Sequence, residues 1–128
     1  KTATLLAKGL GARVTGFYML EEYPLPAYTE FGPIVAPPLT TWKANQKKHA
    51  LRVLAKVEKN ARALGVPCAP AMASSHYPYK AIIDAAKKRK CDLIVMASHG
   101  RRGVGAFLLG SETTKVLTHS KIPVLVCR

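Results

Sequence analysis

The spacing of apolar residues predicts a helix followed at once by a strand at the start of the chain. Leu5, Leu6 and Leu10 lie at helical spacing over residues 1–10, and the glycines at 9 and 11 supply the stop. Residues 14–20 (VTGFYML) are β-branched and aromatic, which is typical of a strand. A helix and a strand in this order make half of an α/β repeat.

The segment 23–41 interrupts this pattern. It holds five of the nine prolines, shows no sustained hydrophobic period and is predicted to be a loop. Loops of this length inside a compact domain are often functional. Three interpretations stay open: a lid over a ligand, a strap that docks a partner, and a plain variable insertion.

The middle of the chain predicts a long helix, an edge strand and a second helix. Apolar residues recur at three and four positions over 42–64, with basic residues opposite, and Gly65 and Pro67 end this helix. A strand near 67–73 contains Pro70, which would confine it to a sheet edge. Pro78 stands where the next helix begins, and the basic run 87–90 suits its C-terminal dipole.

The C-terminal third predicts two strands and one helix. The apolar run 92–97 (DLIVMA) is typical of a parallel strand that is covered on both faces. Ser111 opens a helix with Val116 and Leu117 on its buried side. The last strand covers 122–127, with Pro123 at its start.

The order of these elements predicts an α/β domain with a parallel sheet and right-handed crossovers. The length of 128 residues suits a single domain over 1–128. Because the chain opens in a helix, the strand expected before it is missing. That first strand would be central in a doubly wound sheet, and we expect it upstream of this sequence.

Composition indicates a globular protein, since 48% of the residues are hydrophobic. No apolar run reaches the roughly 18 residues of a membrane span, and no signal peptide is expected at the N-terminus. Three widely separated cysteines without a C-x-x-C pair argue against a disulfide framework or a zinc site. Reduced thiols and a cytoplasmic location are the expectation.

The formal net charge of +13 implies attraction to polyanions. The basic residues are spread over two predicted helices, however, and spread charge is usually a solvated helix face. Neither nucleic acid nor a membrane is therefore the expected partner.

The segment 97–111 (ASHGRRGVGAFLLGS) carries the candidate chemistry, because it follows a buried strand and leads into a helix. Ligands of open α/β sheets bind beyond the carboxyl ends of the strands. Glycines at 100, 103 and 105 allow a close approach of the backbone to an anion. Gly110 and Ser111 stand at a helix start that favours a phosphate, and Arg101 and Arg102 add positive charge. The alternative is a surface loop with an ordinary serine N-cap.

The stretch CDLIVMASHGRRGVGAFLLGSETTKVLTHSKIPVLVCR resembles the C-terminal part of the universal stress protein family. Nucleotide-binding members carry Gly, two residues, Gly, nine residues, then Gly and Ser or Thr. Here Ala97, Gly100, Gly110 and Ser111 occupy that frame. The resemblance extends to LAKGLGARVTGFYML and to the helix within 79–92.

The resemblance implies a Rossmann-like, adenine-nucleotide-binding fold with a five-stranded parallel sheet, helices on both faces, and its first strand absent from this chain. It implies ATP, with or without Mg²⁺, as the bound cofactor, and an unidentified protein partner. The nucleotide-binding residues that it implies are Met19, Met96, Ala97, Ser98, His99, Gly100, Arg101, Arg102, Gly110, Ser111, Glu112 and Thr113. It also implies a homodimer through the last strand, at Val124, Leu125 and Val126.

Two residues depart from the family frame. Ala97 replaces the first glycine, and its methyl group would crowd a ribose only if its φ were positive. Glu112 suits the helix dipole but would repel a triphosphate if its carboxylate pointed inward. The first strand, with the acidic residue that contacts the nucleoside in ATP-binding relatives, lies outside this sequence.

Three functions follow from these observations. The first is a stress-response protein that binds ATP and acts as a nucleotide-gated interaction module. The alternative is a homodimeric interaction protein of the same fold that binds no nucleotide. The third is slow ATP hydrolysis, which the sequence supports least, because it shows no catalytic residue and no metal-ligand set. His99 is interpreted as a hydrogen-bonding loop residue.

Overall fold

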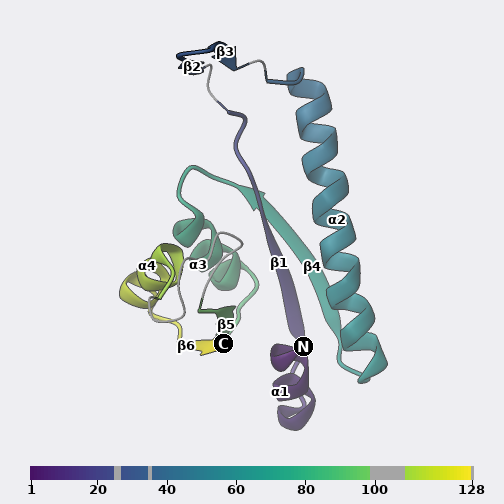
Figure 1. The fold of residues 1–128 in the computed structure, drawn as a ribbon. Helices are drawn as coiled ribbons and strands as arrows, with labels where there is room; N and C mark the ends of the chain where they lie inside the picture. The colour runs from purple at the N-terminus through teal and green to yellow at the C-terminus, as the bar shows by residue number, and fades with distance from the viewer. Residues whose placement is uncertain (25–26, 35, 99–108, 128) are drawn as a thin grey trace.

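The computed structural model describes residues 1–24, 27–34, 36–98 and 109–127 and shows alternating helices and strands (Figure 1). The elements in chain order are α1 (Thr2–Leu10), β1 (Val14–Leu20), β2 (Ala27–Thr29), β3 (Gly32–Ile34), α2 (Leu39–Ala63), β4 (Cys68–Ser74), α3 (Pro78–Lys88), β5 (Ile94–Ala97), α4 (Ser111–His119) and β6 (Val124–Cys127).

Four strands pair in parallel, which confirms the predicted α/β class. β1 pairs with β4, from Val14 opposite Cys68 to Leu20 opposite Ser74. β5 pairs with β6, with Ile94 opposite Val124 and Ala97 in register with Cys127. In the part of the chain that the structure describes, these are two separate pairs, and no ladder joins β1 to β5. The fifth strand expected upstream stays a prediction.

The helices form a layer on each side of the strands. α2 lies along one side of the β1–β4 pair, α3 and α4 lie together on the other side, and α1 lies at the end of the pair where β1 begins (Figure 1). Three small apolar clusters hold these layers. Their buried residues are Ala7, Ala61 and Val66; Tyr18, Ala50 and Leu54; and Ile83, Ala86, Ile94 and Val116.

A glycine sets how closely α2 approaches β1. A Cβ atom built on Gly16 would lie 3.3 Å from Val57 Cγ1 and 3.5 Å from Leu54 Cδ2. A side chain at this position would require the Val57 side chain to shift, so glycine suits the close contact between the strand and the helix. Two predicted stops are also confirmed, because Gly11 ends α1 at φ 61° and Gly65 follows α2 at φ 69°, whereas the prediction is wrong for Gly9, which lies within α1.

Both strand prolines lie where the sequence analysis places them. β4, which contains Pro70, pairs only with β1 among the described strands, and so it is an edge strand. Pro123 immediately precedes β6, and its carbonyl accepts the backbone N–H of Ile94 at 2.9 Å.

The prediction of an unstructured loop over 23–41 is wrong. β2 and β3 form an antiparallel hairpin, in which Thr29 Oγ1 donates to Gly32 O at 3.0 Å and Gly32 has φ 113°. α2 begins at Leu39 instead of residue 42, because Pro38 serves as its N-cap and accepts the Trp42 N–H at 2.9 Å. The high proline content concealed both features.

Candidate functional site

The N-terminus of α4 lies at the carboxyl end of β5. Ser98, the residue after β5, donates its N–H to Cys127 O at 2.7 Å and accepts the N–H of Gly110 at 2.8 Å. These two bonds connect the end of the β5–β6 pair to the start of α4. The sequence analysis placed Ala97, Ser98, Gly110 and Thr113 in one site, and the structure brings these four residues together.

Gly110, and not Ser111, is the N-cap of α4. Gly110 has φ −58° and ψ 143°, and it offers no side chain to the first helical N–H groups. Ser111 is the first helical residue and its side chain is exposed. The first N–H groups of a helix have no acceptor within it, and together with the dipole they favour an anion. The backbone at residues 111–113 can therefore bind a phosphate.

The Thr113 hydroxyl helps to hold α4 in position, and its hydrogen is already donated within the chain. Its hydroxyl donates to the Ala97 carbonyl at 3.0 Å, and the residue is 3% exposed. The buried hydroxyl thus holds the first turn of α4 against the last residue of β5. We assign Thr113 a positioning role in the site.

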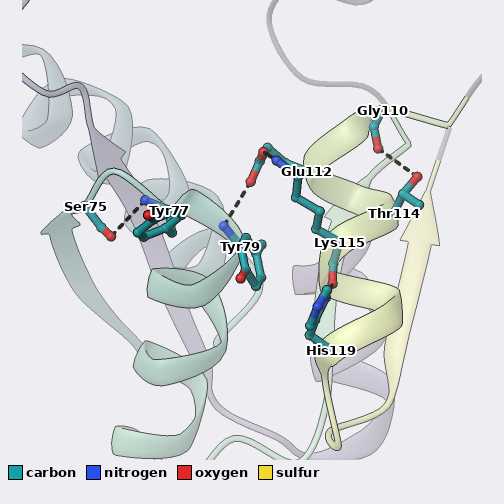
Figure 2. A network of polar contacts seen from close by, with 8 residues as sticks. All are labelled: Ser75, Tyr77, Tyr79, Gly110, Glu112, Thr114, Lys115 and His119. Carbon is teal, nitrogen blue, oxygen red and sulfur yellow. Dashed lines mark hydrogen bonds and ion pairs between the residues drawn. The ribbon is translucent and has the colours of Figure 1, made fainter.

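The Glu112 side chain points to α3. The sequence analysis noted that its carboxylate would repel a triphosphate if it pointed inward. Its Oε2 accepts the backbone N–H of Tyr79 at 3.0 Å, and its Oε1 lies 2.7 Å from Lys115 Nζ (Figure 2). The carboxylate therefore sits against the N-terminal turn of a neighbouring helix. The hydrogen bond from Lys115 to Glu112 raises the pKa of the Lys115 ammonium above its ordinary value.

The aromatic ring of Tyr79 completes the contact between α3 and α4. It packs against the ring of His119 with centroids 4.9 Å apart, and Lys115 Nζ lies 5.9 Å from its centroid. His119 Nδ1 in turn lies 2.8 Å from Lys115 O. Sequence analysis missed Tyr79, although its place directly after Pro78 marks a first-turn N–H that needs an acceptor.

Ala97 does not strain the backbone of the site. Among the described residues, Lys90 is the only non-glycine residue with positive φ, so Ala97 keeps a negative φ within β5. A methyl group is therefore compatible with this position, where the family frame has glycine.

The two methionines of the predicted site lie on different strand pairs. Met96 is on β5 and packs against the cluster around Ile83 and Val116. Met19 is on β1, opposite Ala73 of β4. The remaining predicted residues, His99, Gly100, Arg101 and Arg102, lie outside the described residues and stay predictions.

The strand β6 offers the edge expected for a dimer. β6 pairs with β5 along one edge, and no described strand pairs with its other edge. Leu125 is 38% exposed, whereas Val124 and Val126 are half-buried. An apolar strand with one open edge is a template for pairing with another strand.

The described residues show neither a membrane-spanning helix nor a cluster of metal ligands. No helix there is both long and apolar enough to cross a bilayer. No group of three His, Cys, Asp or Glu residues in these ranges lies close enough together to hold a metal ion.

The fold and this site define an α/β protein whose helix N-terminus follows a parallel strand, and sequence comparison names its family. The profile of the universal stress protein family matches residues 1–128. The universal stress protein MJ0531 of Methanocaldococcus jannaschii is 30% identical over 131 residues, which cover 100% of this chain and 72% of that protein. The chain belongs to the universal stress protein family.

A second relative is closer in sequence over a shorter segment. A universal stress protein of Thermus aquaticus, from the 3′ region of a QAH/OAS sulfhydrylase, is 42% identical over 82 residues. That segment is 63% of this chain and 60% of the relative. The match thus spans about three fifths of the Thermus protein.

Solved structures show the same fold at lower sequence identity. UspA from Lactobacillus plantarum superimposes with a TM-score of 0.75 at 20% identity, over 99% of this chain and 85% of that one. A universal stress protein in complex with cAMP gives 0.63 at 20% identity, over 99% and 82% of the chains. A family member from Arabidopsis thaliana with AMP bound gives 0.61 at 18% identity, over 91% and 64%.

Proposed function

We propose that this protein binds an adenine nucleotide at the N-terminus of α4 and acts as a nucleotide-gated interaction module in a stress response. The observation that carries the proposal is the backbone arrangement at the end of β5. The Gly110 N–H donates to Ser98 O at 2.8 Å, which holds the N-terminus of α4 next to the carboxyl end of β5. Helix N-termini at such strand ends are suited to phosphate groups.

Two further findings support the same proposal. Glu112 is held by Tyr79 and Lys115, so its charge is partly offset and directed to α3. Two structural neighbours were solved with cAMP or AMP bound, which makes an adenine nucleotide the ligand to test. ATP, with Mg²⁺, is the form we expect, and Gly100, Arg101 and Arg102 are the predicted additional phosphate contacts.

A calorimetric titration tests this proposal directly. The protein is titrated with Mg-ATP, AMP and cAMP in separate runs, with inorganic phosphate as the control for a non-specific anion effect. We expect heat and a rise in melting temperature with at least one adenine nucleotide. Absence of both at millimolar nucleotide would contradict the proposal and favour the interaction protein that binds no nucleotide.

The proposed module is a homodimer that pairs its β6 strands. The open edge of β6 and the exposed Leu125 support this assignment. Sedimentation at micromolar concentration is expected to give at least twice the chain mass of 13.9 kDa. A mass of one chain under these conditions would contradict it.

A further inference from the structure

The β2–β3 hairpin lies away from the other helices and strands apart from the start of α2 (Figure 1), and it bears two exposed aromatic side chains. Phe31 is 97% exposed and Tyr28 is 82% exposed. A two-stranded hairpin alone is marginally stable in water, and aromatic residues exposed together mark contact surfaces. We refer to residues 21–24 with the hairpin residues 27–34 as the arm.

Contacts of Tyr23 hold the start of the arm against the segment that leads into α2. Tyr23 donates its hydroxyl to Pro37 O at 2.8 Å, and its ring meets the Trp42 ring edge to face at 6.0 Å. These contacts join the outgoing chain to the start of α2. Packing therefore fixes the residues that precede the hairpin against the start of α2.

The arm is acidic within a strongly basic protein. Residues 14–42 contain no lysine or arginine, yet they hold Glu21, Glu22 and Glu30, three of the seven acidic residues in the chain. The whole chain carries a net charge of +13. The arm thus presents negative charge and aromatic surface together, and it fits a basic surface with an apolar floor.

A groove with these properties lies between α3 and the β1–β4 pair. It has a volume of about 470 Å³, and its floor includes Phe17, Ala71 and Ala81, which are half-buried. The small alanine side chains leave room beside Phe17 for an aromatic ring. We refer to this feature as the groove.

The rim of the groove is positively charged. Lys80, Lys88 and Arg89 line it with exposed side chains, and Asp84 is the acidic residue among the lining. Arg89 Nη2 donates to Pro70 O at 3.4 Å, which holds this cation beside the β4 edge. Three cations against one carboxylate give the rim a net charge opposite to that of the arm.

We propose that the arm of one copy binds in the groove of a second copy of this chain. The aromatic residues of the arm enter over the apolar floor, and its glutamates face the lysines of the rim. Two copies that exchange arms form two identical contacts. The groove shares no residue with the β6 edge, but it extends to the N-terminal turn of α3, which contacts Glu112 of α4.

Charge reversal with mixing tests this exchange. The arm variant carries Glu22→Lys with Glu30→Lys, and the groove variant carries Lys80→Glu with Lys88→Glu. At about 100 µM protein, where a weak contact is populated, each variant alone should sediment with up to twofold lower average mass than wild type. A 1:1 mixture should restore the wild-type mass, because the reversed arm fits the reversed groove and the native arm fits the native groove.

Matched variants separate this exchange from general effects of charge. Asp92→Lys and Lys59→Glu change exposed charges elsewhere and should leave the mass unchanged. Phe31→Ser should lower the mass without lowering the melting temperature, because its side chain makes little contact within the chain. Equal masses for all samples, or a loss that mixing does not restore, would overturn the proposal. Nucleotide titrations of the arm variant and of Phe31→Ser should match wild type, because these residues lie on the arm and not at the N-terminus of α4, so this result and that of the nucleotide proposal can be told apart.

Discussion

Two helix N-termini lie side by side on the same face of this protein, and their surroundings differ. At α3, the Tyr79 N–H donates to the Glu112 carboxylate at 3.0 Å. At α4, the N-cap is Gly110, which has no side chain to offer, and Ser111 is exposed. Among the described residues, a side-chain carboxylate binds the N-terminal turn of α3, whereas no side chain caps that of α4.

The carboxylate that caps α3 comes from the first turn of α4. A carboxylate at that position ordinarily stabilises its own helix dipole and discourages a second anion there. Here the side chain turns to the neighbouring helix and also binds Lys115 at 2.7 Å (Figure 2). The difference between the two N-termini teaches that an acidic residue in the first turn of one helix can serve the N-terminus of its neighbour.

The largest expected effect comes from giving α4 its own anion. Ser111→Asp places a carboxylate at the first helical residue, where it suits the dipole but occupies the proposed phosphate site. We expect the affinity for Mg-ATP to fall about tenfold or more, with an unchanged or slightly higher melting temperature. Calorimetry and thermal unfolding measure the two quantities.

The control for that variant keeps the charge but moves it. Thr118→Asp adds the same carboxylate near the other end of α4, where the side chain is exposed. Its nucleotide affinity should stay near that of wild type. If both variants lost affinity equally, a general charge effect would explain the loss, and α4 would not be the phosphate site.

A smaller effect is expected from removing the anion at α3. Glu112→Ala leaves the Tyr79 N–H without this acceptor, and we expect the free energy of unfolding to fall by about 1 kcal/mol. Glu112→Gln keeps a neutral acceptor and should lose less. Chemical denaturation measures the change, with Glu58→Ala on α2 as the control.

The same variants distinguish two roles of Glu112. If it caps α3, as the geometry indicates, Glu112→Gln should weaken stability while leaving nucleotide affinity equal or higher, since a negative charge is removed. A clear loss of affinity with unchanged stability would instead place Glu112 in contact with the ligand.

The smallest expected effect is a pH dependence of stability that comes from Lys115. The hydrogen bond with Glu112 raises the Lys115 pKa above the ordinary 10.5. A raised pKa means that the folded chain favours the protonated form. The resulting stabilisation is complete below pH 10.5 and is lost as pH rises through the folded value. A side-chain NMR titration should place the Lys115 pKa above 10.5 in the wild type, and Glu112→Gln should lower it toward that value.

Much of the fold follows from local pattern. Glycines at positions 11 and 65 end helices because they adopt positive φ, and Pro70 and Pro123 mark an edge and a strand start because they lack an N–H. The hairpin at Ala27–Ile34 was not predicted, because its strands of three residues are too short to show alternation.

The sequence by itself determined the family frame, the order of the elements and the place of Gly110 and Ser111 after a buried strand. These features depend on residues that are close together in the sequence, and so the spacing of residue types predicts them. The tertiary structure alone decided where Glu112 points and that Thr113 binds Ala97, because both depend on segments 16 or more residues away. The same holds for the arm and the groove, since a surface and its complement become visible only when distant segments are folded together.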